Sequence, residues 1–144
     1  MRLRSAGGDS FWAIRPDLRR FPFVFGRAAA KAEEKEKPKV VEVAYGNSWY
    51  ANANYIGPRS FPSEDGLRPF AGHYRGRSAW EGSMRVAMRK GKLWIGSEAL
   101  VPIGNALFRF GPDSPDTVEF RYLVEGKARM MRYAGADLWR VEAP

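Results

Sequence analysis

Short runs of alternating apolar and polar residues fill the second half of the chain. Met84, Val86 and Met88 alternate with Arg85 and Arg89, a period of two that is typical of a strand with one buried face. Turns rich in glycine and proline separate one run from the next. The pattern predicts eight strands, at residues 70–75, 83–89, 92–95, 99–102, 106–110, 118–124, 128–133 and 137–141.

Eight consecutive strands with short connections predict a closed, all-β architecture. Sequence neighbours are expected to pair antiparallel, and closure removes the two edges that an open sheet would expose. The predicted fold is an eight-stranded antiparallel up-and-down barrel, whose interior is filled by side chains or holds one small ligand. The side chains expected to point inward include Val118, Phe120 and Tyr122, beside Met84, Val86 and Met88.

An internal repeat links the start of the chain to this barrel. Residues 7–12 resemble residues 104–109, and each segment is followed by a Pro-Asp pair and then by an aromatic strand. The similarity continues through residues 41–50, which resemble residues 130–139. The spacing agrees within a residue or two except at a charged insert at residues 31–38, although a chance likeness between small β proteins is the alternative.

The repeat predicts three segments. Residues 1–56 are a partial barrel of about four strands, the last strands of a preceding repeat, and residues 68–144 are the complete barrel. Residues 57–67 are the linker. Four strands would leave two open edges and an apolar face, so a homodimer through residues 1–56 is expected, with a lid over the complete barrel or a loose half-barrel as alternatives.

Charge and composition limit the kinds of site and partner that the chain can have. The 144 residues include 24 Lys and Arg and 16 Asp and Glu, a formal net charge of +8. The basic excess is spread along the chain, which favours a solvated arginine-rich surface and makes nucleic-acid binding an unfavoured interpretation. The absence of cysteine excludes disulfides, cysteine-based zinc sites and thiol catalysis. Neither a signal-peptide core nor an 18-residue apolar run is present, so a cytoplasmic chain without a membrane span is expected by default.

The motifs of serine hydrolysis are incomplete. Tyr50-Ala51-Asn52 matches a Tyr-x-Asn element, but none of the nine serines has a lysine three residues later, and there is no Lys-Thr-Gly. Tyr50 is therefore interpreted as a structural aromatic. The single histidine, His73, has no nucleophile or carboxylate in a local motif, so a hydrogen-bonded structural role is favoured. No catalytic residue, metal site or cofactor is predicted.

Tryptophan and arginine residues of the predicted barrel are the candidate ligand or interface residues. They would line a barrel mouth or stack on nucleotides, although core packing is the commoner fate of such residues. The set is Arg75, Trp80, Arg85, Trp94, Arg121 and Trp139.

Several stretches resemble the C-terminal region of bacterial serine hydrolases of the β-lactamase/penicillin-recognising superfamily, in members similar to D-aminopeptidases. The stretches are residues 7–27, 40–52, 55–59, 71–75, 89–94, 100–111 and 114–120. The resemblance implies two small lipocalin-like barrels that follow a catalytic domain. The catalytic domain and the first half of the first barrel are absent here, so no catalytic residue carries over.

Three functions are therefore considered for the chain. The resemblance implies a non-catalytic accessory module that shapes or covers the active site of a serine hydrolase, whose catalytic domain would be its partner. A free-standing lipocalin-like barrel for a small molecule is the alternative, favoured if an apolar pocket opens at one end of residues 68–141. A nucleic-acid-binding β-barrel is the third.

Overall fold

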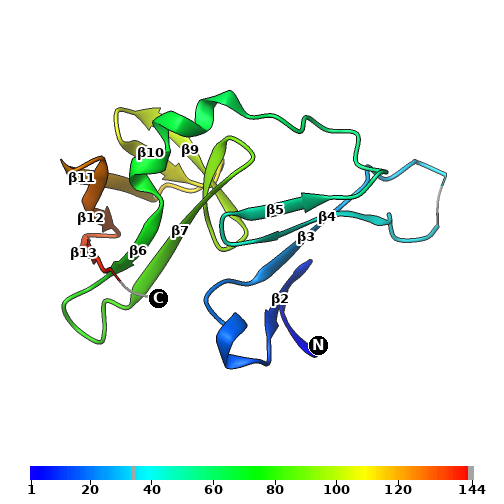
Figure 1. Cartoon of the computed structure of the whole chain (residues 1–144), viewed down its shortest axis with the longest axis horizontal. Helices are drawn as coiled ribbons and strands as arrows, with labels where there is room; N and C mark the ends of the chain where they lie inside the picture. Colours follow the sequence, from blue (N-terminus) through cyan, green and yellow to red (C-terminus); the bar gives the residue numbers. More distant parts are fainter. Residues whose placement is uncertain (34, 143–144) are drawn as a thin grey trace. The chain divides into compact units, whose positions relative to one another are not determined.

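The computed structural model describes residues 1–33 and 35–142 and is built mainly from β-strands (Figure 1). The chain divides into two compact units, Met1–Ser60 and Phe61–Pro144. This division falls within residues 57–67, the segment interpreted from the sequence as a linker. The all-β class expected from the sequence is confirmed.

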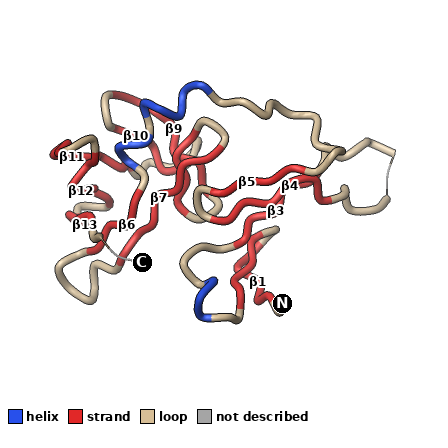
Figure 2. Tube along the Cα trace, in the orientation of Figure 1, coloured by secondary structure: helices blue, strands red, loops and turns tan. Residues whose placement is uncertain are grey.

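The second unit contains a closed barrel of eight antiparallel strands (Figure 2). Each strand pairs with its neighbours in the sequence, and the last strand returns to the first, with Trp139 opposite Arg75 and Arg140 opposite Tyr74. The strands are β6 (Gly72–Arg75), β7 (Ser83–Arg89), β8 (Lys92–Ile95), β9 (Glu98–Gly104), β10 (Leu107–Phe110), β11 (Thr117–Val124), β12 (Lys127–Tyr133) and β13 (Ala136–Arg140). The predicted eight-stranded up-and-down barrel is confirmed.

Two-residue turns fix this order of strands. Lys90-Gly91, Glu125-Gly126 and Ala134-Gly135 each join two paired strands, and both residues of each turn have positive φ. Turns with positive φ at both central residues match the right-handed twist of the strands that they connect. Because these three turns are short, β7 pairs with β8, β11 with β12 and β12 with β13.

Side chains fill the interior of the barrel. Phe120 lies among three other rings: Phe70 stacks on it at 4.9 Å between centroids, and Tyr74 and Phe108 each lie at 5.7 Å. The buried core cluster is Tyr74, Val86, Met88, Leu93, Leu100, Phe108, Val118, Phe120, Ala128, Met131 and Leu138. Packed side chains thus occupy the interior, which is one of the two outcomes expected for eight strands.

Tyr122 departs from the predicted pattern. Val118 and Phe120 are buried as expected, but Tyr122 is 58% exposed. Its φ is +58°, a left-handed conformation that is unusual for a bulky residue within a strand. This conformation breaks the alternation after Arg121. The expectation that Tyr122 points into the barrel is therefore wrong.

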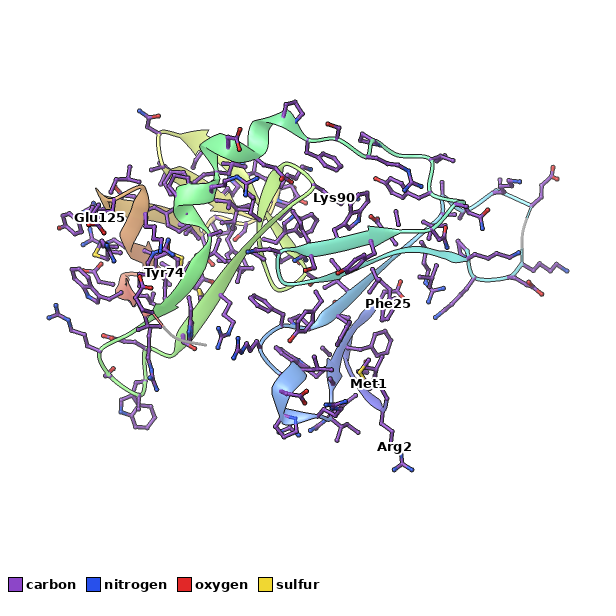
Figure 3. All side chains as sticks on the ribbon, viewed as in Figure 1. Met1, Arg2, Phe25, Tyr74, Lys90 and Glu125 are labelled. Carbon is purple, nitrogen blue, oxygen red and sulfur yellow. The ribbon has the colours of Figure 1, made fainter. Side chains whose placement is uncertain are left out.

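One arginine joins the last strand to the start of the barrel. The Arg140 guanidinium donates hydrogen bonds to the carbonyl oxygens of Ala71 and Pro69 and to the Tyr74 hydroxyl, each at 2.8 Å, and Nε donates to the carbonyl of Ala128. Tyr74, labelled in Figure 3, donates in turn to the carbonyl oxygen of Phe70 at 2.7 Å. Burial raises the pKa of Tyr74 to about 12, so the hydroxyl keeps the proton that it donates.

The Arg140 bonds fix a short helical turn over the barrel. Pro69 and Phe70 belong to the 3₁₀ helix η3 (Arg68–Phe70), which follows η2 (Pro62–Gly66). Gly72 gives the guanidinium its space, because a Cβ there would collide with the Arg140 side chain. The turn, the first strand and the last strand thus share one set of hydrogen bonds.

The first unit is an open antiparallel sheet of five strands, one more than the figure of about four expected from the sequence. Its order follows the sequence: β1 (Leu3–Gly7), β2 (Ser10–Ala13), β3 (Phe23–Arg27), β4 (Val40–Tyr45) and β5 (Ser48–Ala51). The 3₁₀ helix η1 (Pro16–Leu18) connects β2 to β3. The strand missed is β1, whose sequence Leu-Arg-Ser-Ala-Gly has no apolar alternation and whose five residues are all exposed.

The five-stranded sheet repeats β9–β13 of the barrel in register. Gly7 pairs with Ser10 as Gly104 pairs with Leu107, and both strand pairs continue through a register shift at the same place. Three further cross-strand pairs have counterparts in the barrel: Phe11–Phe23 corresponds to Phe108–Val118, Phe25–Val43 to Phe120–Met131, and Val43–Tyr50 to Met131–Leu138. One connecting bond is also repeated: the amide of Phe25 donates to the Asp9 carbonyl, and that of Phe120 to the Ala106 carbonyl, both at 2.9 Å.

The two copies of the repeat differ in how deeply their equivalent side chains are buried. The barrel positions Phe108, Val118, Phe120, Met131 and Leu138 are all buried. Their counterparts Phe11, Phe23, Phe25 and Val43 are only half-buried, and Tyr50 is 66% exposed. The first unit therefore has the interior face of a barrel but only five of the eight strands.

We expect Phe120→Ala to lower the free energy of unfolding by about 3–5 kcal/mol, because it removes the ring at the centre of the core. Arg121→Ala is the matched control on the same strand and should change it by about 0.5 kcal/mol or less, since that side chain lies outside the barrel. Urea denaturation followed by tryptophan fluorescence measures both. Equal losses would contradict the assignment of the inner face.

Gly72→Ala is expected to destabilise the protein by about 1–3 kcal/mol, because the new methyl group displaces the Arg140 guanidinium and leaves carbonyl groups without their donor. Gly66→Ala is the control: its Cβ meets nothing within 4 Å and its φ is not positive, so the change should stabilise slightly or do nothing. Thermal unfolding of the two variants gives the comparison. A Gly72→Ala protein as stable as wild type would show that the guanidinium is not held at this site.

Candidate functional site

Three of the predicted ligand residues lie together, but on the outside of the barrel and not at its mouth. Arg121 is opposite Met130, Met130 is opposite Trp139, and Trp139 is opposite Arg75. Residues directly opposite each other on neighbouring strands project from the same face of a sheet. The residues directly before Arg75, Arg121 and Trp139 belong to the core, so these three side chains face the other way, outward; Met130 between them is itself covered and only 2% exposed.

Two residues not predicted from the sequence complete the cluster. The Tyr122 ring stacks on Trp139 with centroids 6.1 Å apart and planes 5° from parallel. The Arg77 guanidinium lies over the Trp139 ring at 5.1 Å from the centroid, which is a cation–π contact. The aromatic–arginine patch is defined here as Arg75, Arg77, Arg121, Tyr122 and Trp139.

No sequence signal marks the two missed residues. Tyr122 falls at an inward position of the alternating pattern, and only its left-handed backbone turns it outward. Arg77 lies in the loop between β6 and β7, where no period assigns a direction. Loop residues carry much of the binding chemistry of proteins.

Ion pairs flank the patch and compensate part of its charge. Arg121 bonds Glu119 at 2.9 Å, and Arg132 bonds Asp137 at 2.7 Å. The hydrogen bond from Arg121 holds the pKa of Glu119 below its usual value, and that from Arg132 does the same for the pKa of Asp137. Both carboxylates are therefore charged at neutral pH. The outer surface here is mixed in charge, not uniformly basic.

The other three predicted residues lie apart from the patch. Trp94 is on β8, where its indole N–H donates to the Arg89 carbonyl at 2.9 Å and the Arg89 guanidinium lies over the ring at 4.8 Å. Trp80 is 98% exposed in the loop between β6 and β7. Arg85 faces outward from β7, opposite His73. The six residues therefore do not form one site.

His73 differs from the hydrogen-bonded histidine that was expected. Both of its ring nitrogens are buried and have no hydrogen-bond partner within the described residues. Burial lowers the pKa of His73, and the charges of Arg85 and Arg75 lower it further. A neutral imidazole without a carboxylate to orient it lacks the surroundings of a general base in a catalytic triad.

Residues 1–33 and 35–142 contain no group of three or more His, Asp or Glu side chains arranged to hold a metal ion. Across the same residues, no helix is long and apolar enough to cross a membrane.

Cavities of about 550, 500 and 270 Å³ lie in the first unit. The smallest is a groove along β3, β4 and β5, lined among others by Phe25, Val43 and Tyr50. These three residues occupy interior positions of the repeat. The groove is therefore the part of the barrel interior that the five-stranded sheet leaves open.

Comparison with protein-family models, with curated protein sequences and with solved structures found no match to this chain. The resemblance to the C-terminal barrels of serine hydrolases accordingly rests on the residues of this sequence alone and stays a prediction.

The free energy of unfolding is expected to fall as the pH decreases below about 6.5, the ordinary pKa of histidine, because the unfolded chain binds a proton that the half-buried His73, with its lowered pKa, resists. His73→Gln should remove this dependence. Urea denaturation between pH 8 and pH 5, above the range where carboxylates titrate, isolates the effect of the single histidine. An identical pH dependence in the variant would mean that another group is responsible.

Proposed function

We propose that the chain is a non-catalytic accessory β-barrel module of a β-lactamase-like serine hydrolase, which shapes or covers a neighbouring active site. The observation that carries the proposal is the repeat. Five strands of the first unit match β9–β13 of the barrel pair by pair, including the register shift between Ser5 and Gly7 and the equivalent shift between Pro102 and Gly104. An arrangement of two successive barrels is what the family resemblance implies, and this register supports it.

The side chains support a non-catalytic role. None of the nine serines has the lysine three residues later that would activate a nucleophile of this class. His73, the one histidine, is half-buried near the charges of Arg85 and Arg75 and has a lowered pKa. A module of this kind acts through its surfaces, by restricting which substrates reach the active site of its partner.

The two alternative functions have less support. A lipocalin-like binder needs space inside the barrel, but the rings of Phe70, Phe108 and Phe120 pack against one another there. A nucleic-acid-binding surface needs uncompensated basic charge. On the outer face of the barrel, Arg121 and Arg132 are each paired with a carboxylate.

We expect no acylation of this chain by a fluorophosphonate or a fluorescent penicillin, because the nucleophile and its base are missing. Mass spectrometry of the treated protein measures the reaction, and a penicillin-binding protein serves as the positive control. A stoichiometric adduct that disappears when one serine is replaced by alanine would overturn the proposal.

The accessory role is tested by the coding sequence upstream of Met1 and by assay in trans. The proposal predicts an in-frame domain with Ser-x-x-Lys in that sequence. Adding this chain to that catalytic domain should change KM for a large substrate more than KM for a small one, since a cover acts by steric restriction. An unrelated domain in its place would contradict the proposal.

A further inference from the structure

The open edge of the first unit at β5 differs from the opposite edge at β1. Residues 46–58, which contain β5, include no charged side chain. The β1 edge carries Arg4 and has a register shift between Ser5 and Gly7. Charged side chains and bulges are the features by which proteins prevent strand addition at an edge. The β1 edge is protected in this way along its strand, whereas the first charged residue after β5 is Arg59, which lies beyond the strand and whose guanidinium donates to the carbonyls of Asn52 and Tyr55.

The equivalent edge of the complete barrel shows how a further strand pairs there. β5 corresponds to β13, and Ala51 corresponds to Trp139, which pairs antiparallel with Arg75 of β6. The amide of Asn52 donates to Val41 within the sheet. Because successive residues of an antiparallel strand direct their backbone groups to opposite sides, the N–H and C=O of Ala51 point away from β4.

An apolar groove lies beside this edge. Phe25, labelled in Figure 3, lines it with Val43 and Tyr50, and its volume is about 270 Å³. In the complete barrel the counterpart of Phe25 is Phe120. Two rings cover it: that of Tyr74, on the strand that pairs with β13, and that of Phe70, in the turn before that strand. A strand added to β5 would cover the groove in the same way.

We propose that a second copy of this chain supplies that strand, with β5 of the two copies paired about a twofold axis. A twofold axis perpendicular to the sheet makes the two strands antiparallel, which is the geometry of the β13–β6 pair. Ten strands then form one continuous sheet, and the grooves of both copies lie on the same face. The uncharged edge lets two identical strands approach without repulsion.

The proposal places the twofold axis at Tyr50, which lines the groove. Ala51 directs its backbone groups outward, so Tyr50 directs its own toward β4 and two facing Tyr50 residues form a non-hydrogen-bonded pair. The Cα atoms of such a pair are about 4.5 Å apart, and their side chains are the closest of any cross-strand pair. This separation lies within the range that a disulfide bridges.

A cysteine at the centre of the interface tests the proposal. The natural chain contains no cysteine, so Tyr50→Cys has a single thiol. We expect mild oxidation of the full-length variant to convert most of it to a disulfide-linked dimer. Tyr122→Cys, an exposed tyrosine on the barrel, is the matched control and should cross-link only at the background rate. Equal cross-linking of the two variants would overturn the proposal.

The mass in solution provides the second measurement. Light scattering of the full chain at increasing concentration should approach twice the chain mass of 16.3 kDa. Ala51→Pro removes an outward N–H and leaves the β4–β5 bonds intact, so it should weaken dimerisation at least tenfold. A monomer at every concentration would overturn the proposal. So would a dimer that forms equally well with Ala51→Pro, if the separate Tyr50→Cys variant also fails to cross-link. These outcomes do not depend on any hydrolase, so they are separate from the test of the accessory role.

Discussion

The closed barrel depends on the guanidinium of Arg140. The seam between β13 and β6 consists of only two residue pairs. Arg140 adds bonds to the carbonyls of Ala71 and Pro69 and to the Tyr74 hydroxyl, and so ties the last strand to the first strand and to the turn before it. Hydrogen bonds from a charged donor are stronger than neutral ones. They also bring Phe70 onto Phe120, so closure of the seam and packing of the core stabilise each other.

The first unit shows the same chain pattern without that arginine. By the register of the repeat, Asn52 stands where the barrel has Arg140, and its side-chain amide donates to Val40 as Arg140 Nε donates to Ala128. The shorter Asn52 side chain makes this one hydrogen bond, to the neighbouring strand β4. A guanidinium adds bonds that reach a preceding turn and the next strand. The same five-strand register thus belongs to a sealed interior in the barrel, where β6, β7 and β8 complete it, and to a half-exposed apolar face in the first unit, which has five strands.

Backbone strain produces the main surface feature of the barrel. A left-handed conformation at a bulky residue costs on the order of 1–3 kcal/mol and persists where its surroundings compensate. At Tyr122 the compensation includes stacking on Trp139, whose ring also contacts Arg77. The patch is accordingly a product of one backbone conformation and of strand pairing, and its arginines are partly neutralised by the carboxylates beside them.

The sequence by itself determined the strands, the turns and the repeat, because alternation over a few residues and glycine at a turn act locally. It also identified Trp139, Arg75 and Arg121 as candidates, since tryptophan and arginine are residue types that line binding surfaces and stack on ligands. Only the tertiary structure decided on which side of the barrel they lie, that Tyr122 joins them, and that Leu3–Gly7 is a strand. The role of Arg140 also appeared only in the fold, because its partners Pro69 and Ala71 are about seventy residues away in the chain. Such contacts depend on the closure of the barrel, which no local pattern encodes.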